Sequence, residues 1–170
     1  MADLWTTLIL TAIPLYVANA SAMVFGGKTP LDMEKKWMDG RRLLGKGKTW
    51  KGTGMGILIG TFTGFSLAFF FPTYTESVSS HFVAFAFLLS VGALTGDMIG
   101  SFIKRRMGME SGKPAHVLDQ LDFVLGGILF SLGINPPNWT VFLLLIMITP
   151  FMHLTFNRIA YITGIKGVPW

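Results

Sequence analysis

Long apolar runs recur along the chain, and each is long enough to cross about 30 Å of hydrocarbon. Hydrophobic residues make up 51% of the 170 residues and charged residues only 14%, against about 25% charged in a soluble domain. This composition excludes intrinsic disorder and predicts an all-α integral membrane protein. The chain has no room for a separate soluble catalytic domain, so we expect residues 1–170 to form one transmembrane domain.

Five spans fit the alternation of apolar and polar stretches. The predicted spans cover residues 4–25, 55–72, 82–103, 117–134 and 139–156, with polar loops at 26–54 and 104–116. All 14 Lys and Arg residues lie in these two loops and in the C-terminal tail. Because positive charge is retained in the cytoplasm, we predict an outside N-terminus, cytoplasmic loops and a cytoplasmic C-terminus. The protein is then a multi-pass protein of the cell membrane.

Other readings of the same features are weaker. A cleaved signal peptide over residues 1–20 is disfavoured, because Asp3 makes the start acidic and the basic cluster follows the apolar run. Membrane topology explains the net charge of +5, so no nucleic-acid partner is expected. With no cysteine, disulfides, thiolate catalysis and Cys-ligated metals are excluded.

Glycine recurs at every fourth position along two of the predicted spans. The two series are Gly52, Gly56, Gly60 and Gly64, then Gly92, Gly96 and Gly100. Small residues on one helix face predict close helix packing. The alternative is that Gly52 and Gly96, which adjoin polar motifs, let a substrate approach the backbone.

A short amphipathic helix is predicted over residues 29–38. Thr29 would cap it and Pro30 would take its first position, with Trp37 at the membrane interface.

Asp97 is an acid inside an apolar span, about 10 Å deeper than Lys104 at about 1.5 Å rise per residue. An ionised carboxylate at that depth must be paired or hydrated, so it should face a polar cavity. Ser101, Lys104 and Arg105 follow on the same helix face. The four side chains indicate a functional site, and the alternative is a relay that only solvates Asp97.

A second acidic group stands where the fourth predicted span begins. Asp119 and Asp122 share nearly one helix face, and His116 precedes them. Together with Asp97 they supply the oxygen ligands that Mg²⁺ prefers, so we predict Asp97, Asp119 and Asp122 as a magnesium site. N-terminal capping of the helix is the alternative, which explains one acid well and two less well, and the role of His116 stays open.

Glycines and cations alternate in the stretch 45–53, just before the second predicted span. Exposed backbone N–H groups, lysines and a helix N-terminus suit a polyphosphate, although the glycine spacing is not that of a Walker A loop. The candidate phosphate-binding residues are Lys46, Lys48, Thr49, Lys51 and Gly52. Anchoring on anionic lipid headgroups is the alternative.

These groups all fall at shallow depth on one side of the membrane. Carboxylates for a divalent cation, together with Lys and Arg for phosphates, are typical of phosphoryl or nucleotidyl transfer. A site open to lipid predicts one lipid substrate and one soluble substrate. Two other hypotheses remain: a small transporter with Asp97 as an ion or proton relay, and a membrane scaffold without catalysis.

Two motifs resemble the signature of the CDP-diacylglycerol synthase family. They are Gly96-Asp97-x-x-x-Ser101-x-x-Lys104-Arg105-Arg106-x-Gly108 and Leu118-Asp119-x-x-Asp122. The segment 48–52 resembles the family's Lys-Lys-Thr-x-Glu-Gly stretch, with Lys51 in place of Glu. The compact length is most similar to the archaeal branch, the CDP-archaeol synthases.

The resemblance implies a reaction and a set of roles. Mg²⁺-dependent transfer of CMP from CTP to 2,3-bis-O-(geranylgeranyl)-sn-glycerol 1-phosphate would give unsaturated CDP-archaeol and pyrophosphate, with membrane lipids around the site. Asp97, Asp119 and Asp122 would hold the metal. Lys104, the fourth catalytic residue, would hold phosphates. CTP and its phosphates would be held by Lys46, Lys48, Thr49, Lys51, Gly52, Ser101 and Arg105. The oligomeric state is left open.

Overall fold

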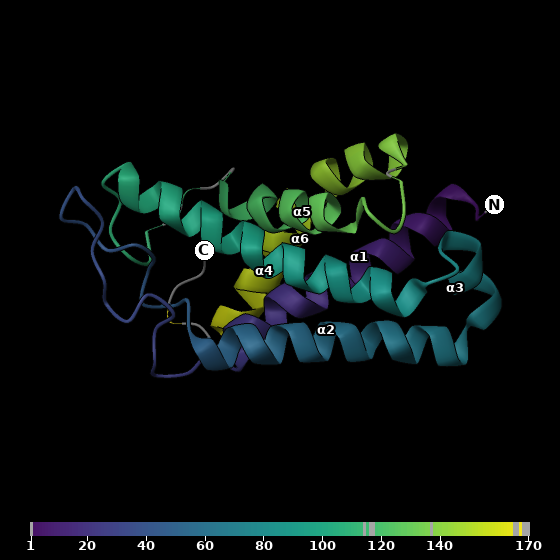
Figure 1. The fold of residues 1–170 in the computed structure, drawn as a ribbon, viewed down its shortest axis with the longest axis horizontal. Helices are drawn as coiled ribbons and strands as arrows, with labels where there is room; N and C mark the ends of the chain where they lie inside the picture. Colours follow the sequence, from purple (N-terminus) through teal and green to yellow (C-terminus); the bar gives the residue numbers. More distant parts are fainter. Residues whose placement is uncertain (1, 114, 116–117, 137, 165–166, 168–170) are drawn as a thin grey trace.

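The computed structural model describes residues 2–113, 115, 118–136, 138–164 and 167. Within them the chain forms six helices. They are α1 (Leu4–Val24), α2 (Trp50–Phe70), α3 (Pro72–Val78), α4 (Phe82–Arg106), α5 (Leu118–Ser131) and α6 (Trp139–Ile162). Figure 1 shows α2 and α4 running along the long axis, with α3 joining them at one end. The all-helical class predicted from the sequence is confirmed.

Four of the described helices are long and apolar enough to cross a membrane: α1, α2, α4 and α6. The stretch predicted as the fourth span forms α5, whose 14 residues reach only about 21 Å at about 1.5 Å per residue. That is shorter than the hydrocarbon core of about 30 Å. The fifth span and the orientation of the chain therefore stay predictions.

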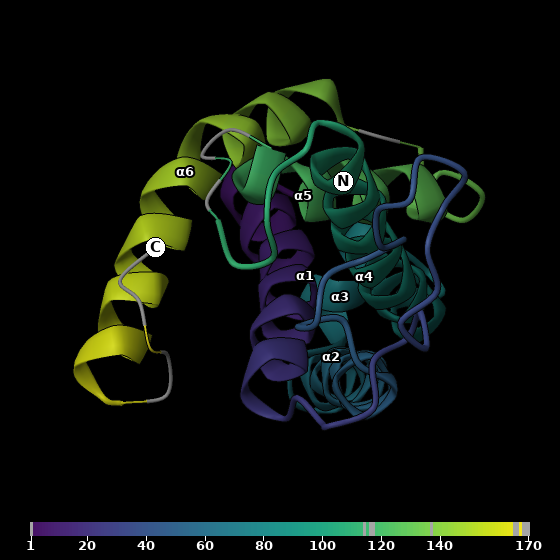
Figure 2. The ribbon, with the colours of Figure 1, turned by 90° about the vertical axis from the view of Figure 1, so that its left-hand side faces the viewer.

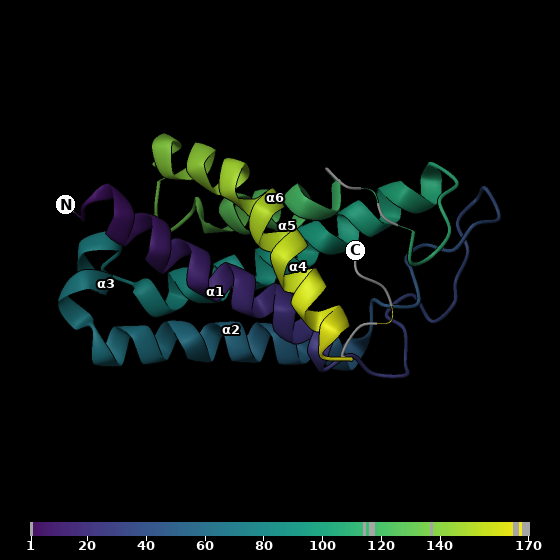
Figure 3. The ribbon, with the colours of Figure 1, turned by 180° about the vertical axis from the view of Figure 1, so that it is seen from behind.

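The two predicted cytoplasmic loops lie at the same end of the helix bundle. In Figure 1 the long loop between α1 and α2 stands beyond the C-terminal end of α4, opposite the N-terminus and α3. The view from behind in Figure 3 places the last turns of α6 at the loop end as well. This arrangement agrees with the predicted segregation of the basic segments.

The glycine face of α2 packs directly on α1 and α4. Gly52, Gly56, Gly60 and Gly64 are its buried residues. A Cβ at Gly60 would lie 2.7 Å from the Ala18 Cβ, and one at Gly56 would lie 2.7 Å from the Ala18 carbonyl oxygen. Because lipid is as apolar as the side chains, such close packing supplies much of the attraction between membrane helices. The packing prediction for this face is confirmed.

Gly96 serves helix packing in the same way, so the alternative of substrate access at this position is wrong. A Cβ there would lie 3.0 Å from the Cα of Gly126 and would overlap the Asp122 carbonyl. The neighbouring Gly92 faces Gly127, where a Cβ would come within 2.8 Å of the Cα. Helices α4 and α5 are therefore held backbone to backbone.

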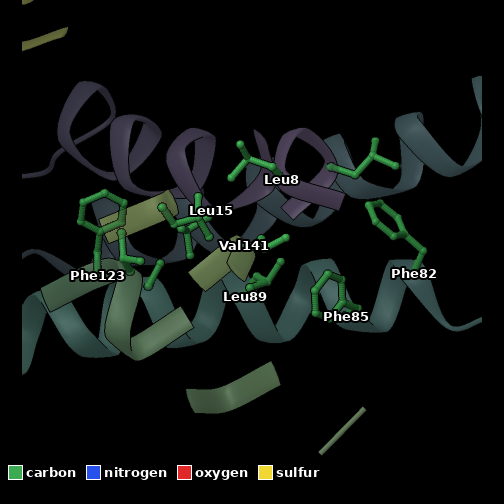
Figure 4. Close-up of a cluster of buried hydrophobic side chains, with 11 residues drawn as sticks. Leu8, Leu15, Phe82, Phe85, Leu89, Phe123 and Val141 are labelled. Carbon is green, nitrogen blue, oxygen red and sulfur yellow. The ribbon is translucent and has the colours of Figure 1, made fainter. Parts of the chain in front are cut away.

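A cluster of buried apolar side chains joins four helices around α4. Figure 4 shows members of this cluster from α1, α4, α5 and α6. The labelled side chains are Leu8, Leu15, Phe82, Phe85, Leu89, Phe123 and Val141. The cluster fixes the rotation of α4, which carries the predicted site residues.

The amphipathic helix predicted over residues 29–38 is wrong. This segment forms turns and two isolated bridges, Pro30 with Thr49 and Lys36 with Arg42. The Asp32 carboxylate accepts hydrogen bonds from Arg42 and from the backbone N–H groups of Glu34 and Leu44. The bond from Glu34 is local and competes with helix formation, while those from Arg42 and Leu44 tie Asp32 to a later part of the loop.

Adding a single methyl group to the packed face of α2 should destabilise the protein. We expect Gly60→Ala to lower the unfolding free energy by about 1–3 kcal/mol, because the Ala18 Cβ is fixed to α1 and cannot move away. Gly54→Ala is the matched control, since a Cβ there meets no atom within 4 Å. Thermal unfolding in detergent compares the two, and equal stability would contradict the packing argument.

The loop around Asp32 should open in acid. Burial raises the pKa of Asp32. The hydrogen bonds from Arg42, Leu44 and Glu34 together lower it by more, so the pKa lies below the ordinary value of 3.8. A depressed pKa stabilises the loop above the ordinary value, and this contribution is lost as the pH falls below about 4. Hydrogen exchange of the Leu44 amide should therefore lose protection in that range.

Asp32→Asn should weaken this protection above about pH 4 and remove its acid dependence, because wild-type Asp32 is itself neutral in stronger acid. Wild-type protection that stays constant down to about pH 3, after correction for intrinsic exchange, would contradict the role given to the carboxylate.

Candidate active site

A cavity of about 810 Å³ lies at the loop end of the bundle, between α1, α4, α6 and the loops. Figure 2 looks onto this end, with α1 standing between the last turns of α6 and α4. Nine of the eleven predicted site residues line the cavity: Lys46, Lys48, Thr49, Gly52, Asp97, Ser101, Lys104, Arg105 and Asp119. A smaller hollow of about 390 Å³, between α3 and the start of α4, contains no predicted site residue.

Asp97 is held by a lysine from the loop. The Lys48 ammonium donates to an Asp97 carboxylate oxygen at 2.5 Å, across 49 residues of sequence. Burial lowers the pKa of Lys48, but Asp97, Asp122 and Asp119 together raise it above the ordinary value. The ammonium therefore stays charged and neutralises the acid inside the membrane helix.

A second ion pair forms across the cavity wall between α4 and α5. Lys104 donates to one carboxylate oxygen of Asp119, and the other oxygen accepts the Ala115 backbone N–H at 2.9 Å. Arg105 is a third charged side chain on the wall, and only 6% of it is exposed. The acids Asp97 and Asp119 and the cations Lys48, Lys104 and Arg105 therefore all line the same cavity.

Asp122 is placed differently from the prediction. Its carboxylate packs on Gly100 of α4 and accepts the Phe123 backbone N–H at 2.7 Å. It is buried and is not among the residues that line the cavity. Although Asp119 and Asp122 are three residues apart, only Asp119 faces the cavity, because α5 turns the second acid toward α4.

The three carboxylates do not form a ready-made ligand set for a metal. Within the described ranges, no three Asp, Glu or His side chains lie close enough together to hold one. Carboxylate oxygens are nevertheless the ligands that a hard cation prefers, and two of these acids, Asp97 and Asp119, line the same cavity. His116 lies outside the described residues.

The stretch 45–52 is fastened to both sides of the cavity. The backbone N–H of Gly45 donates to Ser101 Oγ at 3.3 Å, and that of Lys46 donates to Ser111 Oγ at 3.1 Å. Thr49 caps α2 by accepting the N–H of Gly52 and also accepts the N–H of Gly27. Ser101 and Thr49 therefore position this stretch.

Lys51 is an exception among the candidate phosphate-binding residues. It is exposed, lies beside Gly27 and is not among the cavity-lining residues.

Sequence reasoning missed the contribution of α1 and α6. Tyr16 and Asn19 of α1, with His153 and Asn157 of α6, line the same cavity. Tyr16 also shares a 2.7 Å hydrogen bond with Thr149. Thr149, His153 and Asn157 repeat every fourth residue in an apolar helix, and that polar spacing was the signal available in the sequence.

Comparisons with known proteins agree on one family. The sequence model of the CarS-like family, CDP-archaeol synthase, matches residues 1–170. The CDP-archaeol synthase of Methanocaldococcus jannaschii is 46% identical, covering 99% of this chain and 96% of the relative. The CDP-archaeol synthase of Pyrococcus horikoshii is also 46% identical, covering 93% of this chain and 92% of the relative.

A solved structure is similar over most of the fold. It is that of an intramembrane enzyme for archaeal membrane lipids biosynthesis, with a TM-score of 0.76 and 39% identity over 88% of this chain and 91% of that one. Sequence and fold thus agree, and the chain belongs to the CDP-archaeol synthase family.

Proposed function

We propose that this chain is a membrane cytidylyltransferase that forms CDP-archaeol. It transfers CMP from CTP to the phosphate of 2,3-bis-O-(geranylgeranyl)-sn-glycerol 1-phosphate and releases pyrophosphate, with its site facing the cytoplasm. The relatives named CDP-archaeol synthase support this activity. The fold similarity to an intramembrane enzyme of archaeal lipid biosynthesis supports the membrane setting.

One observation carries the proposal: a single cavity has a charged wall and an apolar wall. Lys46, Lys48, Lys104 and Arg105 line it together with Asp97 and Asp119. Val17, Ala20 and Phe156, from α1 and α6, line it as well. The charged wall suits a triphosphate and a phosphomonoester, whereas the apolar wall suits isoprenoid chains. A water-soluble substrate and a lipid can therefore meet there.

The chemistry requires positioning and charge compensation more than proton transfer. A lipid phosphate oxygen attacks the α-phosphorus of CTP in line, and the bond from that phosphorus to the bridging oxygen of pyrophosphate breaks. The phosphomonoester is already ionised at neutral pH, so the mechanism needs no general base. Lys48 and Lys104 exchange a carboxylate partner for phosphate oxygens, while Lys46 and Arg105 add positive charge.

We propose Mg²⁺ as the cofactor, held by Asp97 and Asp119. Asp122 would lie next to this site, packed against Gly100 outside the cavity. Bound at this site, the metal would neutralise charge on the phosphates. The ion pair of Lys48 with Asp97 supports this assignment, because a positive charge already lies against that carboxylate. Thr49 and Gly52 shape the nucleotide loop, and Ser101 holds it through Gly45.

Neutralising the acid of the first ion pair should stop the reaction. We expect Asp97→Asn to lower CTP-dependent formation of CDP-lipid by about 100-fold or more, because Lys48 loses its partner and the metal loses a ligand. Labelled CTP and the purified protein measure it. Glu76→Gln, an exposed acid at the opposite end, is the control. Normal turnover by Asp97→Asn would contradict the proposal.

Removal of divalent cations should abolish turnover, and added Mg²⁺ should restore it. The assay compares protein treated with a chelator and protein resupplied with Mg²⁺, on archaetidate-type lipid phosphate and on phosphatidate. Full activity after chelation would contradict the cofactor assignment, whereas CTP-independent ion flux in liposomes would favour a transporter.

A further inference from the structure

Two arginines exchange hydrogen bonds between the long loop and the end of α4. Arg41 Nη1 donates to the carbonyl oxygen of Arg106 at 2.8 Å and to that of Arg105 at 3.5 Å. In return, Arg106 Nη2 donates to the carbonyl of Arg42 at 2.5 Å, and its Nη1 donates to Asp39 at 2.7 Å. We call Arg41, Arg106 and Asp39 the arginine clamp.

The arginine clamp acts on backbone groups that the helix leaves unpaired. The last carbonyls of a helix have no partner within it, and Arg41 supplies one for α4. The Arg106 guanidinium also lies over the Phe102 ring, 4.9 Å from its centroid, and Trp37 contacts the same ring edge-on. The loop is thereby fixed to α4 by both directional and packing contacts.

Hydrogen bonds hold the loop between the clamp and the cavity. Arg42 donates to both carboxylate oxygens of Asp32, at 2.6 and 3.2 Å, and the Leu44 N–H donates to the same group at 3.0 Å. Gly45 follows immediately and is bonded to Ser101 of α4. The clamp is therefore connected to Lys48 through a short stretch in which Arg42, Leu44, Gly45 and Lys46 are each hydrogen-bonded.

Arg41 and Arg106 themselves do not line the cavity. We propose that they are positioning residues, which lock the loop onto α4 so that Lys46 and Lys48 face the cavity in the geometry that binds the triphosphate. The kinetic part of this inference rests on the proposed function. The structural part concerns only the path of the loop and can be tested without substrate.

The absence of cysteine from the sequence permits a direct distance measurement. Spin labels on Gly47→Cys, where a side chain meets no atom within 4 Å, and on Leu129→Cys, an exposed site on α5, report the loop position. We expect one narrow distance distribution in the otherwise unaltered protein and broad ones in Arg106→Ala and Arg41→Ala. Lys36→Ala, an exposed cation of the same loop, is the control.

Arg106→Lys tests whether Arg106 acts by positioning the loop, rather than through its charge or through the stability of the fold. Lysine keeps the positive charge but cannot form the fork of bonds to Asp39 and the Arg42 carbonyl. We expect Arg106→Lys to broaden the distribution as well, with thermal unfolding close to the control. Distributions that stay narrow in Arg106→Lys and in both alanine variants would overturn the proposal.

Kinetics give the second readout. A displaced loop should raise the KM for CTP about tenfold in Arg106→Lys, with the KM for the lipid phosphate within about twofold of the control. A fall in kcat with both KM values unchanged would overturn the positioning role. If the unaltered protein has no cytidylyltransferase activity, the proposed function fails, while the distance measurement still decides the role of the arginine clamp.

Discussion

The ion pair between Lys48 and Asp97 is the constraint on which the rest of the site depends. A carboxylate inside a membrane helix is stable only when it is paired or hydrated. Here its partner comes from a loop 49 residues away, so that loop must fold back over the end of α4. Once it does, Gly45 reaches Ser101 and Thr49 caps α2. The need to neutralise one charge on a membrane helix thus organises a long segment that has little regular structure.

Close helix packing decides what the ion pairs face. Gly96 and Gly126 let α4 and α5 approach until their backbones touch, and Gly100 leaves space for the Asp122 carboxylate. This approach brings Asp119 to Lys104 and gives the cavity its second acid. Helices in lipid gain little from apolar attraction, so they associate through close packing. Small residues at the contact allow the backbones to come this close. Packing and electrostatics therefore both depend on the contact between α4 and α5.

The cavity also indicates how a transmembrane domain would bring together the two unlike substrates of the proposed reaction. Its charged wall comes from the loop, α4 and α5, whereas α1 and α6 contribute most of its apolar wall. In the proposed reaction the ion pairs hold the lysines ready, and phosphates compete with the carboxylates for them. The polar side chains Tyr16, Asn19, His153 and Asn157 lie on the α1 and α6 side, so that wall is not uniformly apolar. Every long helix therefore contributes to the cavity lining, α2 through its first turn alone.

The sequence by itself determined the membrane class, the positions of the long helices, the glycine face of α2 and nine of the residues that line the cavity. These depend on hydropathy and on spacing within one helix, which are local properties. Only the tertiary structure decided that Asp122 turns to Gly100 while Asp119 faces the cavity, because helix spacing does not fix the rotation of α5 against α4. It alone showed that residues 29–38 are not helical, since the competing bonds of Asp32 come from Arg42 and Leu44, beyond the helical turn. Which lysine pairs with which acid was likewise a matter of chain path, which no local pattern records.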